Sequence, residues 1–306
     1  MDTSVSFGLP SFFGFAYSVD QVKVLNLLKE AKKQKGAKVI LMVAPSFVVD
    51  FDYKKFVPKM HGLGFDLVTE LTFGAKIVNQ NYYKYIKGKK KLQAKFISSV
   101  CPSSVLLVKN RYSELTQFLM PFDSPMIAMA KVLKKNHPKH KIVFASPCSA
   151  KKMEAKNFNE KSKKVLIDAV ITFSELKQIV AKEKPSLKGS NTFDSFYNEY
   201  TKIYPLSGGL SATLHAKDIL LRDELVSCDG CQNLQLLFDK HSDKVFYDIL
   251  FCPGGCIGGN GIASKMPTFW KRKRVLSYRK AASRIKEGQK VGLGKYTKGI
   301  DFSAEF

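Results

Sequence analysis

Short runs of apolar and β-branched residues alternate along this chain with longer segments in which apolar residues recur every three to four positions. Such runs are typical of strands buried in parallel sheets, and the longer segments suit the helices that connect parallel strands. The pattern therefore predicts an α/β fold. The runs are KVILMVAP (38–45), FDLVTEL (65–71), KFISSV (95–100), KIVFAS (141–146), KVLIDAVIT (164–172) and KVFYDILF (244–251).

Helical periodicity follows several of these runs. Ser174 stands where an N-cap residue is expected, at the start of the helix predicted for 174–184. The segment 183–193 has the composition of a linker, and the basic tail after Trp270 is predicted to be helical through Arg284. The other predicted helices are SVLLVKNRYSELTQFL (104–119), SPMIAMAKVLKK (124–135) and QNLQLLFDKHS (232–242).

The bulk composition is that of a globular protein. The chain has 306 residues, of which 45% are hydrophobic, and this is long enough for one large domain or two lobes. No run of 18 apolar residues occurs, so we expect no membrane span. The N-terminal segment carries Asp2 and no basic stretch, which is unlike a signal peptide. We therefore expect a cytoplasmic protein.

The net charge is unusually positive. Fifty Lys and Arg residues against 26 Asp and Glu give +24, with basic blocks at 87–91, 134–141 and 271–274. Such a field favours acidic partners, although solvated surfaces rich in lysine would give the same composition. Because the blocks form no stripe interleaved with aromatic residues, the sequence argues against a nucleic-acid partner.

Cysteines follow three of the predicted strands. Cys101 comes directly after KFISSV, Cys148 after KIVFAS and Cys252 after KVFYDILF. Since α/β folds place their sites beyond the carboxyl ends of the strands, these cysteines are expected to converge on one site. In a cytosolic chain of this size, cysteines are more often ligands or reactive thiols than members of a disulfide framework.

The spacing of the cysteines allows a zinc site. Cys228, Cys231, Cys252 and Cys256 give C-x₂-C-x₂₀-C-x₃-C, which is close to the spacing of a zinc ribbon. This interpretation leaves Cys101 and the equally placed cysteine at 148 unexplained. A purely structural role as small buried hydrophobic residues also suits any one of these thiols.

An iron–sulfur cluster accounts for more of the sequence. In FCPGGCIGGNG (251–261), five of eleven residues are glycine, which gives room for a bulky inorganic group and for backbone N–H donors around it. The natural four ligands are Cys101, Cys148, Cys252 and Cys256. Cys228 and its neighbour at 231 then remain open, either as thiols in a turn or as a redox or metal-binding pair.

Three motifs together resemble a known family. ISSVCPSSV (97–105), ASPCSAKKMEA (145–155) and CPGGCIGGNG (252–261) are similar, in this order, to the three cluster-binding signatures of the iron-only (FeFe) hydrogenase catalytic domain. The resemblance runs from about Lys38 to Trp270. YPLSGGLSATL (204–214) is most similar to the sensory branches of that family.

The resemblance implies a fold, a cofactor and its ligands. It implies two α/β lobes, 1–140 with the first motif and 141–306 with the other two motifs and the basic tail. Each lobe would hold a small, mostly parallel twisted sheet flanked by helices, with a metal cluster in the cleft between the lobes. Cys101, Cys148, Cys252 and Cys256 would hold a 4Fe–4S cubane. Cys256 would also bridge to a diiron subcluster with CO, cyanide and dithiolate ligands.

Further residues around the cluster are implied by position. Lys151 would donate to a cyanide as a charge-assisted contact, and Ser46 could donate from the other side. Glu154 would brace the loop of Lys151, or would simply be its i,i+3 partner on a solvated turn. The residues implied to line the pocket are Ala44, Pro45, Pro147, Ser149 and Leu250.

The sequence departs from the family where protons are supplied. Val100 stands in place of the cysteine that shuttles protons in the active enzymes, and Asn81 and Tyr82 stand where glutamates would relay them. Because positioned acids and bases accelerate proton transfer by roughly 10²–10⁴-fold, we expect slow or sensory hydrogen turnover. The alternative is a non-catalytic 4Fe–4S protein, related to cytosolic iron–sulfur assembly factors and without the diiron unit.

The resemblance also implies partners. With no ferredoxin-like cysteine run in this sequence, we expect electrons to pass through the cubane itself to an acidic, ferredoxin-like carrier. Docking on the basic block 271–274 suits such a carrier. Hydrogenase maturation proteins would build the diiron unit.

Overall fold

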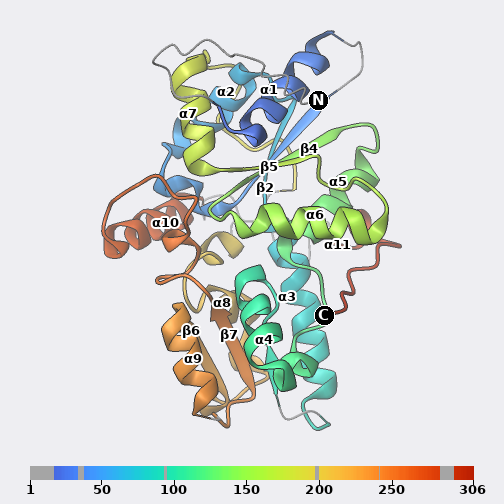
Figure 1. Cartoon of the computed structure of the whole chain (residues 1–306), viewed down its shortest axis with the longest axis vertical. Coiled ribbons are helices and arrows are strands. Elements are labelled where there is room, and N and C mark those ends of the chain that lie inside the picture. The colour runs from blue at the N-terminus through green and yellow to red at the C-terminus, as the bar shows by residue number, and fades with distance from the viewer. Residues whose placement is uncertain (1–16, 34–37, 93–94, 197–199, 241, 283–292) are drawn as a thin grey trace, which may run out of the picture.

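The computed structural model describes residues 17–33, 38–92, 95–196, 200–240, 242–282 and 293–306. The described residues form two sheets that lie one above the other along the long axis of the molecule (Figure 1). In both sheets every pairing is parallel, as the sequence predicted. Among the described residues, no helix combines the length and the apolar character needed to cross a bilayer.

The first sheet has the strand order β2–β1–β4–β5. Its central strand β1 (Val39–Val43) is buried at every residue, because it pairs on both edges and is covered on both faces. The neighbouring strands are β2 (Leu67–Glu70), β4 (Lys141–Ser146) and β5 (Ala169–Thr172).

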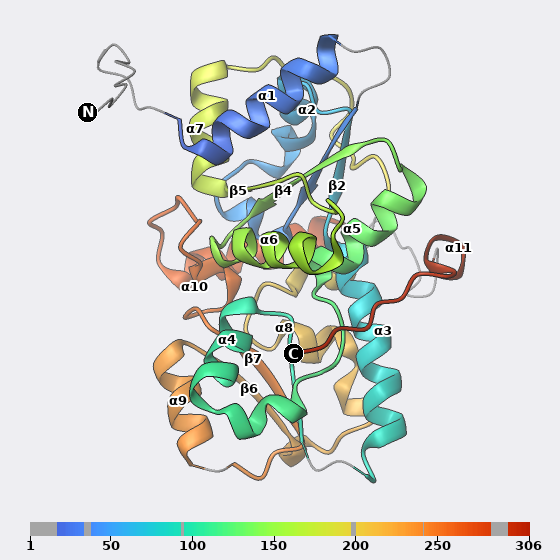
Figure 2. The ribbon, with the colours of Figure 1, turned by 45° about the vertical axis from the view of Figure 1, so that its right-hand side comes forward.

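Helices cover both faces of this sheet. One group lies on one side and a second group on the other, as both views show (Figure 2). The first group is α1 (Val19–Lys33), α2 (Tyr53–Leu63) and α7 (Phe173–Glu183); the second is α5 (Pro125–Asn136) and α6 (Ala150–Ser162). This placement on both faces explains why the strands are apolar without alternation.

The second sheet has the order β3–β7–β6. Its central strand β7 (Phe246–Leu250) sends Tyr247 and Ile249 into one hydrophobic cluster and Phe246 and Leu250 into the other. The helices around this sheet are α3 (Thr72–Lys89), α4 (Pro102–Arg111), α8 (Gly209–Leu214) and α9 (Cys231–Asp239). The outer strands are β3 (Phe96–Ile97) and β6 (Leu225–Asp229), and β6 was not among the predicted strands.

The two sheets do not divide the chain at residue 140. Strand β3, which belongs to the first half of the sequence, pairs with β7 in the second sheet, whereas β4 from beyond residue 140 pairs with β1 in the first. The predicted lobes 1–140 and 141–306 therefore do not match the sheets. Because the chain passes from one sheet to the other and back, the first and third cysteine motifs share one sheet and the second lies in the other.

Local chemistry moves two of the predicted helix ends. The helix predicted for 104–119 ends at Arg111, because Tyr112 leaves helical geometry (φ −133°, ψ 54°) and packs against Phe238; a 3₁₀ helix, Ser113–Phe118, follows. Helix α7 is capped by Thr172 and not by Ser174. Thr172 accepts from the Glu175 N–H while the Glu175 carboxylate accepts from the Thr172 N–H, which is a capping box.

The basic segment near the C-terminus forms α10 (Thr268–Ala282), and Leu293–Thr297 forms the short helix α11. The predicted helix end at Arg284 lies outside the described residues. Tyr278 of α10 reaches the interior, where its hydroxyl donates to Glu70 Oε1 at 2.9 Å and accepts from Lys202 Nζ at 2.7 Å. Glu70 and Lys202 form an ion pair with both side chains 0% exposed.

This buried ion pair generates a stability prediction. Lys202→Met leaves the Glu70 carboxylate without its cation in a site from which water is excluded, so we expect the free energy of unfolding to fall by about 3–5 kcal/mol. Urea unfolding of the purified protein measures it. The double variant Glu70→Gln with Lys202→Met should recover most of the loss, since it removes both charges. A single variant as stable as the unsubstituted chain would contradict the prediction.

Candidate metal centre

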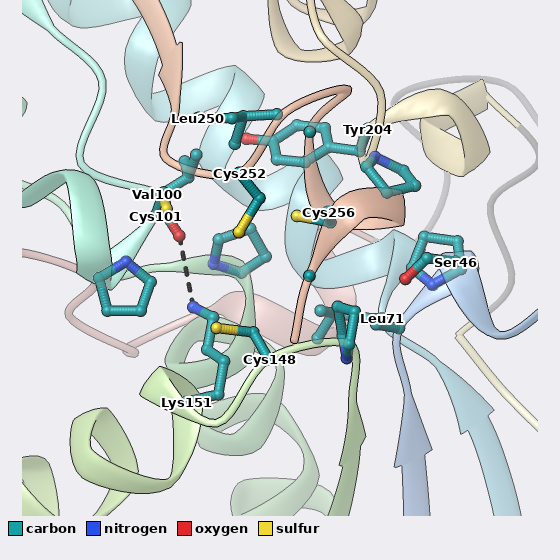
Figure 3. A pocket seen from close by; sticks show the side chains of 18 of the residues that line it. Ser46, Leu71, Val100, Cys101, Cys148, Lys151, Tyr204, Leu250, Cys252 and Cys256 are labelled. Carbon is teal, nitrogen blue, oxygen red and sulfur yellow. Dashed lines mark hydrogen bonds between the residues drawn. The ribbon is translucent and has the colours of Figure 1, made fainter. Parts of the chain in front are cut away.

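The carboxyl ends of strands from both sheets open onto one cavity (Figure 3). Cys101 follows β3 at the start of α4, Cys148 follows β4, and Cys252 and Cys256 lie in the loop after β7. All four line this cavity. The sequence prediction that the cysteines past the strand ends converge is therefore met in the structure.

Two of the thiols in the cavity have pKa values that are raised by burial and by the neighbouring cysteines. Burial raises the pKa of the Cys256 thiol, and the charges of Cys101, Cys148 and Cys252 raise it further. Burial, with the charges of Cys101 and Cys148, raises the pKa of Cys252 to about 11. Four thiolates in this cavity therefore need positive charge among them, which metal ions supply.

The arrangement suits a group larger than one ion. Across the part of the chain that the structure describes, no three His, Cys, Asp or Glu side chains are placed to hold a single metal ion. The four cysteines face a common space without meeting at a point. A cubane cluster takes one thiolate at each of four corners, so a polynuclear cluster fits this donor set.

The zinc interpretation does not fit the geometry. Cys228 lies in β6 and packs against the hydrophobic cluster on the outer face of the second sheet, and Cys231 is the first residue of α9. Neither lines the cavity. Cys252 and Cys256 share their space with the cysteines at 101 and 148 instead.

The glycines of the last motif allow the loops to approach one another. A Cβ at Gly255 (φ +84°) would lie 2.5 Å from the carbonyl oxygen of Pro205, and one at Gly259 would lie 2.3 Å from that of Pro147. The Cys256 N–H donates to Pro205 O at 2.7 Å. These glycines are thus required for contact between loops, in addition to the room that the sequence predicts they give to a cluster.

Lys151 supplies the positive charge at the cavity. Its Nζ lies 2.6 Å from Glu154 Oε2 and donates to Val100 O at 3.3 Å and to Ser124 Oγ at 3.2 Å. The dashed line in Figure 3 marks its bond to Val100. Glu154 does not line the cavity, so it acts through Lys151, as an i,i+3 partner that holds the ammonium group in place.

The opposite wall carries an unused donor. Ser46 belongs to the 3₁₀ helix Pro45–Val49 after β1, and its Oγ is buried with no hydrogen-bond partner among the described residues. Because a buried hydroxyl is rarely left unpaired, Ser46 is available to a group bound in the cavity. Ala44, Pro45, Pro147 and Leu250 also line the cavity.

The wall beside Cys101 is apolar at the position where the sequence lacks a proton-shuttling side chain. Val100 lines the cavity, and Tyr82 stands behind it, fully buried. The Tyr82 hydroxyl lies 2.8 Å from Ser99 Oγ and accepts from the Ser99 N–H at 2.8 Å, so it braces the backbone before Val100. Asn81 is half-buried and does not line the cavity.

The structure adds and removes residues from the predicted site. Ser149 does not line the cavity, since its N–H is bound by the side chain of Asn260 at 2.9 Å. Tyr204 lines it although its role was not predicted; the only signal was its place before the paired glycines at 208–209. Further lining residues that the sequence did not indicate are Leu71, Ala75, Pro102, Pro125, Phe144 and Pro205.

Comparison with protein families identifies one match. Residues 37–260 match the model described as the iron only hydrogenase large subunit, C-terminal domain. Iron hydrogenase 1 of Clostridium pasteurianum is 26% identical over 79% of this chain. The match covers 52% of that relative, so this chain spans about half its length.

Solved structures share the fold. A single-residue variant of the [FeFe]-hydrogenase HydA1 from Chlamydomonas reinhardtii superposes with a TM-score of 0.69 at 16% identity, covering 93% of this chain and 98% of that one. A structure described as revealing stepwise [FeFe]-hydrogenase H-cluster assembly gives 0.68 at 18% identity, covering 83% and 88%.

The cavity predicts which cysteines hold iron. After anaerobic reconstitution with iron and sulfide, we expect about four of each per chain, as a 4Fe–4S cluster requires. Changing Cys101, Cys148, Cys252 or Cys256 to serine should lower both and bleach the visible absorption, because each removes one corner ligand. Iron and sulfide analysis with absorption spectra measures this.

Two cysteines outside the cavity provide matched controls. Cys228→Ser and Cys231→Ser should retain the iron and sulfide of the unsubstituted chain. Loss of metal in these two variants, with retention in Cys101→Ser, would overturn the assignment. It would favour Cys228, Cys231, Cys252 and Cys256 as the ligands instead.

Proposed function

The chain belongs to the family of the iron only hydrogenase large subunit, C-terminal domain, and from that premise we propose that it reacts with dihydrogen at a cubane–diiron cluster. Cys101, Cys148, Cys252 and Cys256 would hold the cubane, and Cys256 would bridge to the diiron unit. When bound, the cluster would supply the chemistry by which two protons and two electrons interconvert with dihydrogen.

One observation carries this proposal. Four thiols, the ammonium group of Lys151 and the unpartnered hydroxyl of Ser46 face one cavity whose remaining wall is mostly apolar. A cubane alone needs the four thiols. The positive charge of Lys151 and the unpartnered hydroxyl of Ser46 suit a second, anionic group that accepts hydrogen bonds.

Lys151 has a defined task in this arrangement. Its ion pair with Glu154 and its bonds to Val100 O and Ser124 Oγ fix the ammonium group at the cavity edge. A positioned cation stabilises anionic ligands that would otherwise be buried without compensation. The apolar residues Val100, Leu250 and Phe251 exclude water from the same space.

Val100 sets the expected rate. A valine side chain cannot give or take a proton, so the position that would deliver protons to the reacting group delivers none. Because positioned acids and bases are worth roughly 10²–10⁴-fold, we propose slow turnover, as in a sensor. The same residue supports a second candidate, a 4Fe–4S protein that holds no diiron unit and does not turn over dihydrogen.

Infrared spectroscopy separates the two candidates. The protein would be made anaerobically together with hydrogenase maturation proteins and scanned for stretches of metal-bound CO and cyanide. The proposal expects such bands, and expects them to change under dihydrogen. A protein with about four iron and four sulfide per chain but no bands would be the cubane-only protein, and the hydrogenase proposal would fail.

In the same preparations, Val100→Cys tests the cause of slow turnover. Restoring a side chain that exchanges protons should raise hydrogen evolution by roughly 10²-fold, within the range of general acid catalysis. Val100→Ala controls for the change in cavity size and should leave the rate low. Equal rates of hydrogen evolution in Val100→Cys and Val100→Ala would show that Val100 is not the cause of slow turnover.

We also propose an acidic electron carrier that docks at α10. A Cβ at Gly254 would lie only 2.5 Å from Cγ2 of Thr268, at the start of this helix. The helix therefore contacts the loop that carries Cys252 and Cys256. Arg272, Lys273 and Arg274 are exposed on it. A basic surface next to the metal loop suits an acidic, ferredoxin-like partner in the cytoplasm.

Charge reversal tests the docking surface. Changing Arg272 and Lys273 to glutamate should raise the KM for an acidic ferredoxin about tenfold, because rim charges govern encounter, and should leave the rate with a small dye mediator unchanged. Steady-state assays at low and high salt measure this. Reversal of Lys87 and Lys89, at the C-terminal end of α3, is the matched control. Equal KM changes for both sets would contradict docking at α10.

A further inference from the structure

A second cavity, separate from the cysteine-lined cavity, opens beside helix α3. It has a volume of about 450 Å³, which is within the range of small-molecule sites, roughly 300–1,000 Å³. Its described lining residues come from one stripe of α3, from the 3₁₀ helix Tyr200–Ile203, and from the end of α8 with the turn that follows it. None of these residues lines the cysteine-lined cavity. The proposed function has not used this space.

Asn79 supplies an unused hydrogen-bond acceptor at the second cavity. The side chain lines the cavity, and its Nδ2 donates to Thr213 Oγ1 at 3.0 Å, which joins α3 to α8 (Figure 1). The Thr213 hydroxyl donates in turn to Gly209 O at 2.7 Å, so its oxygen has to accept and the orientation of the Asn79 amide is fixed. Asn79 Oδ1 is buried with no partner among the described residues. Because a buried carbonyl oxygen is rarely left unpaired, it is available to an N–H group of a bound molecule.

Aromatic rings form part of the wall. The rings of Tyr200 and His215 are nearly parallel, 3° apart, with centroids separated by 5.2 Å. The Tyr200 hydroxyl lies 2.7 Å from His215 Nε2, a contact that holds the two side chains together. Tyr83, which is half-buried, lines the cavity as well. Since aromatic side chains stack on the faces of nucleobases, this wall suits a planar heterocycle.

Lysines add positive charge to the same space. The described lining residues include Lys76 and Lys84 and one carboxylate, that of Asp218. Lys76 is buried, whereas Lys84 is exposed. An exposed ammonium group binds phosphate as a point charge. A planar ligand that also carries a phosphate therefore matches the cavity better than a neutral one.

We propose that the second cavity binds an adenine nucleotide, of which AMP is the simplest. The adenine ring stacks at Tyr200, its 6-amino group donates to Asn79 Oδ1, and its phosphate binds the ammonium group of Lys84. The purine of IMP has a carbonyl oxygen in place of the amino group, so it would set one acceptor against another. Selection of AMP over IMP thus follows from the orientation of the Asn79 amide. The binding itself does not depend on the hydrogenase function.

Two elements border both cavities. Helix α3 contributes Ala75 to the cysteine-lined cavity and Asn79 to the second cavity. The 3₁₀ helix that contributes to the second cavity leads directly into Tyr204, which lines the cysteine-lined cavity. The two elements are joined where Thr201 Oγ1 donates to Thr72 O at 2.6 Å. A nucleotide that orders these elements is therefore expected to alter binding at the cysteine-lined cavity, and the coupling is equal in both directions.

The first test measures selection of the base. Isothermal titration calorimetry of the unsubstituted protein should show AMP binding about tenfold more tightly than IMP, because IMP leaves Asn79 Oδ1 unpaired. Asn79→Leu should abolish the preference by weakening AMP alone. Asn81→Leu is the matched control, since Asn81 lies on the same helix and lines neither cavity. No binding of AMP, or equal affinities for AMP and IMP, would overturn the proposal.

The second test measures recognition of the phosphate and uses surface substitutions that leave the interior intact. Lys84→Glu should weaken AMP about tenfold and leave adenosine unchanged, because adenosine has no phosphate. Lys87→Glu changes the same charge on an exposed residue of α3 that does not line the cavity, and should alter neither affinity. Equal losses of AMP affinity in the two variants would show that surface charge alone attracts the phosphate, and the site would be wrong.

The third test measures the coupling without turnover. The affinity for AMP should differ about fivefold between the cluster-free protein and the protein reconstituted with iron and sulfide. Equal affinities would overturn the coupling. Loss of AMP selection with CO and cyanide bands intact would overturn the nucleotide site and leave the hydrogenase function standing. Selective AMP binding in a protein without such bands would support the nucleotide site while the hydrogenase proposal fails.

Discussion

The pairing of β3 with β7 is the constraint on which the site depends. These strands lie about 150 residues apart in the sequence, yet Phe96 and Ile97 pair in register with Phe246 and Tyr247. The pairing brings Cys101 beside the loop that carries Cys252 and Cys256. The corresponding pairing of β1 with β4 brings Cys148 and Ser46 to the same place from the other sheet. The cavity therefore exists only when both sheets are complete.

Much of this could be predicted from local sequence because the relevant signals are local. An apolar run followed by cysteine indicates a strand with a site at its carboxyl end, and β3, β4 and β7 all follow that rule. Sheet membership is different, since nothing within 95–100 states that its partner lies at 246–247. For this reason the sequence did not indicate that each sheet takes strands from both sides of residue 140. The cap of α7 was misplaced because Thr172 and Ser174 are both good capping residues, and only the reciprocal bond with Glu175 decides between them.

Residues that act by contact were the least predictable. Tyr204 does not follow a strand and belongs to no motif with a defined spacing. The close approach of Pro205 to Gly255 nevertheless places the Tyr204 ring in the cavity wall. Asp248 sits within an apolar strand and was included there only as part of its hydrophobic run. A single carboxylate in a buried strand has to be satisfied by a neighbour, and its partner Ser211 comes from a helix of six residues.

Holding a cluster and supplying it with protons place different demands on a protein. The first needs several loops in fixed register, which here depends on backbone contacts such as Cys256 N–H to Pro205 O and Gly261 N–H to Pro147 O. The second needs one exchangeable group at the cavity wall and a path to water behind it. A wall built from several loops offers more than one place for such a group. Val100 offers no exchangeable proton beside Cys101, whereas Tyr204 carries a buried hydroxyl on the wall of the same cavity.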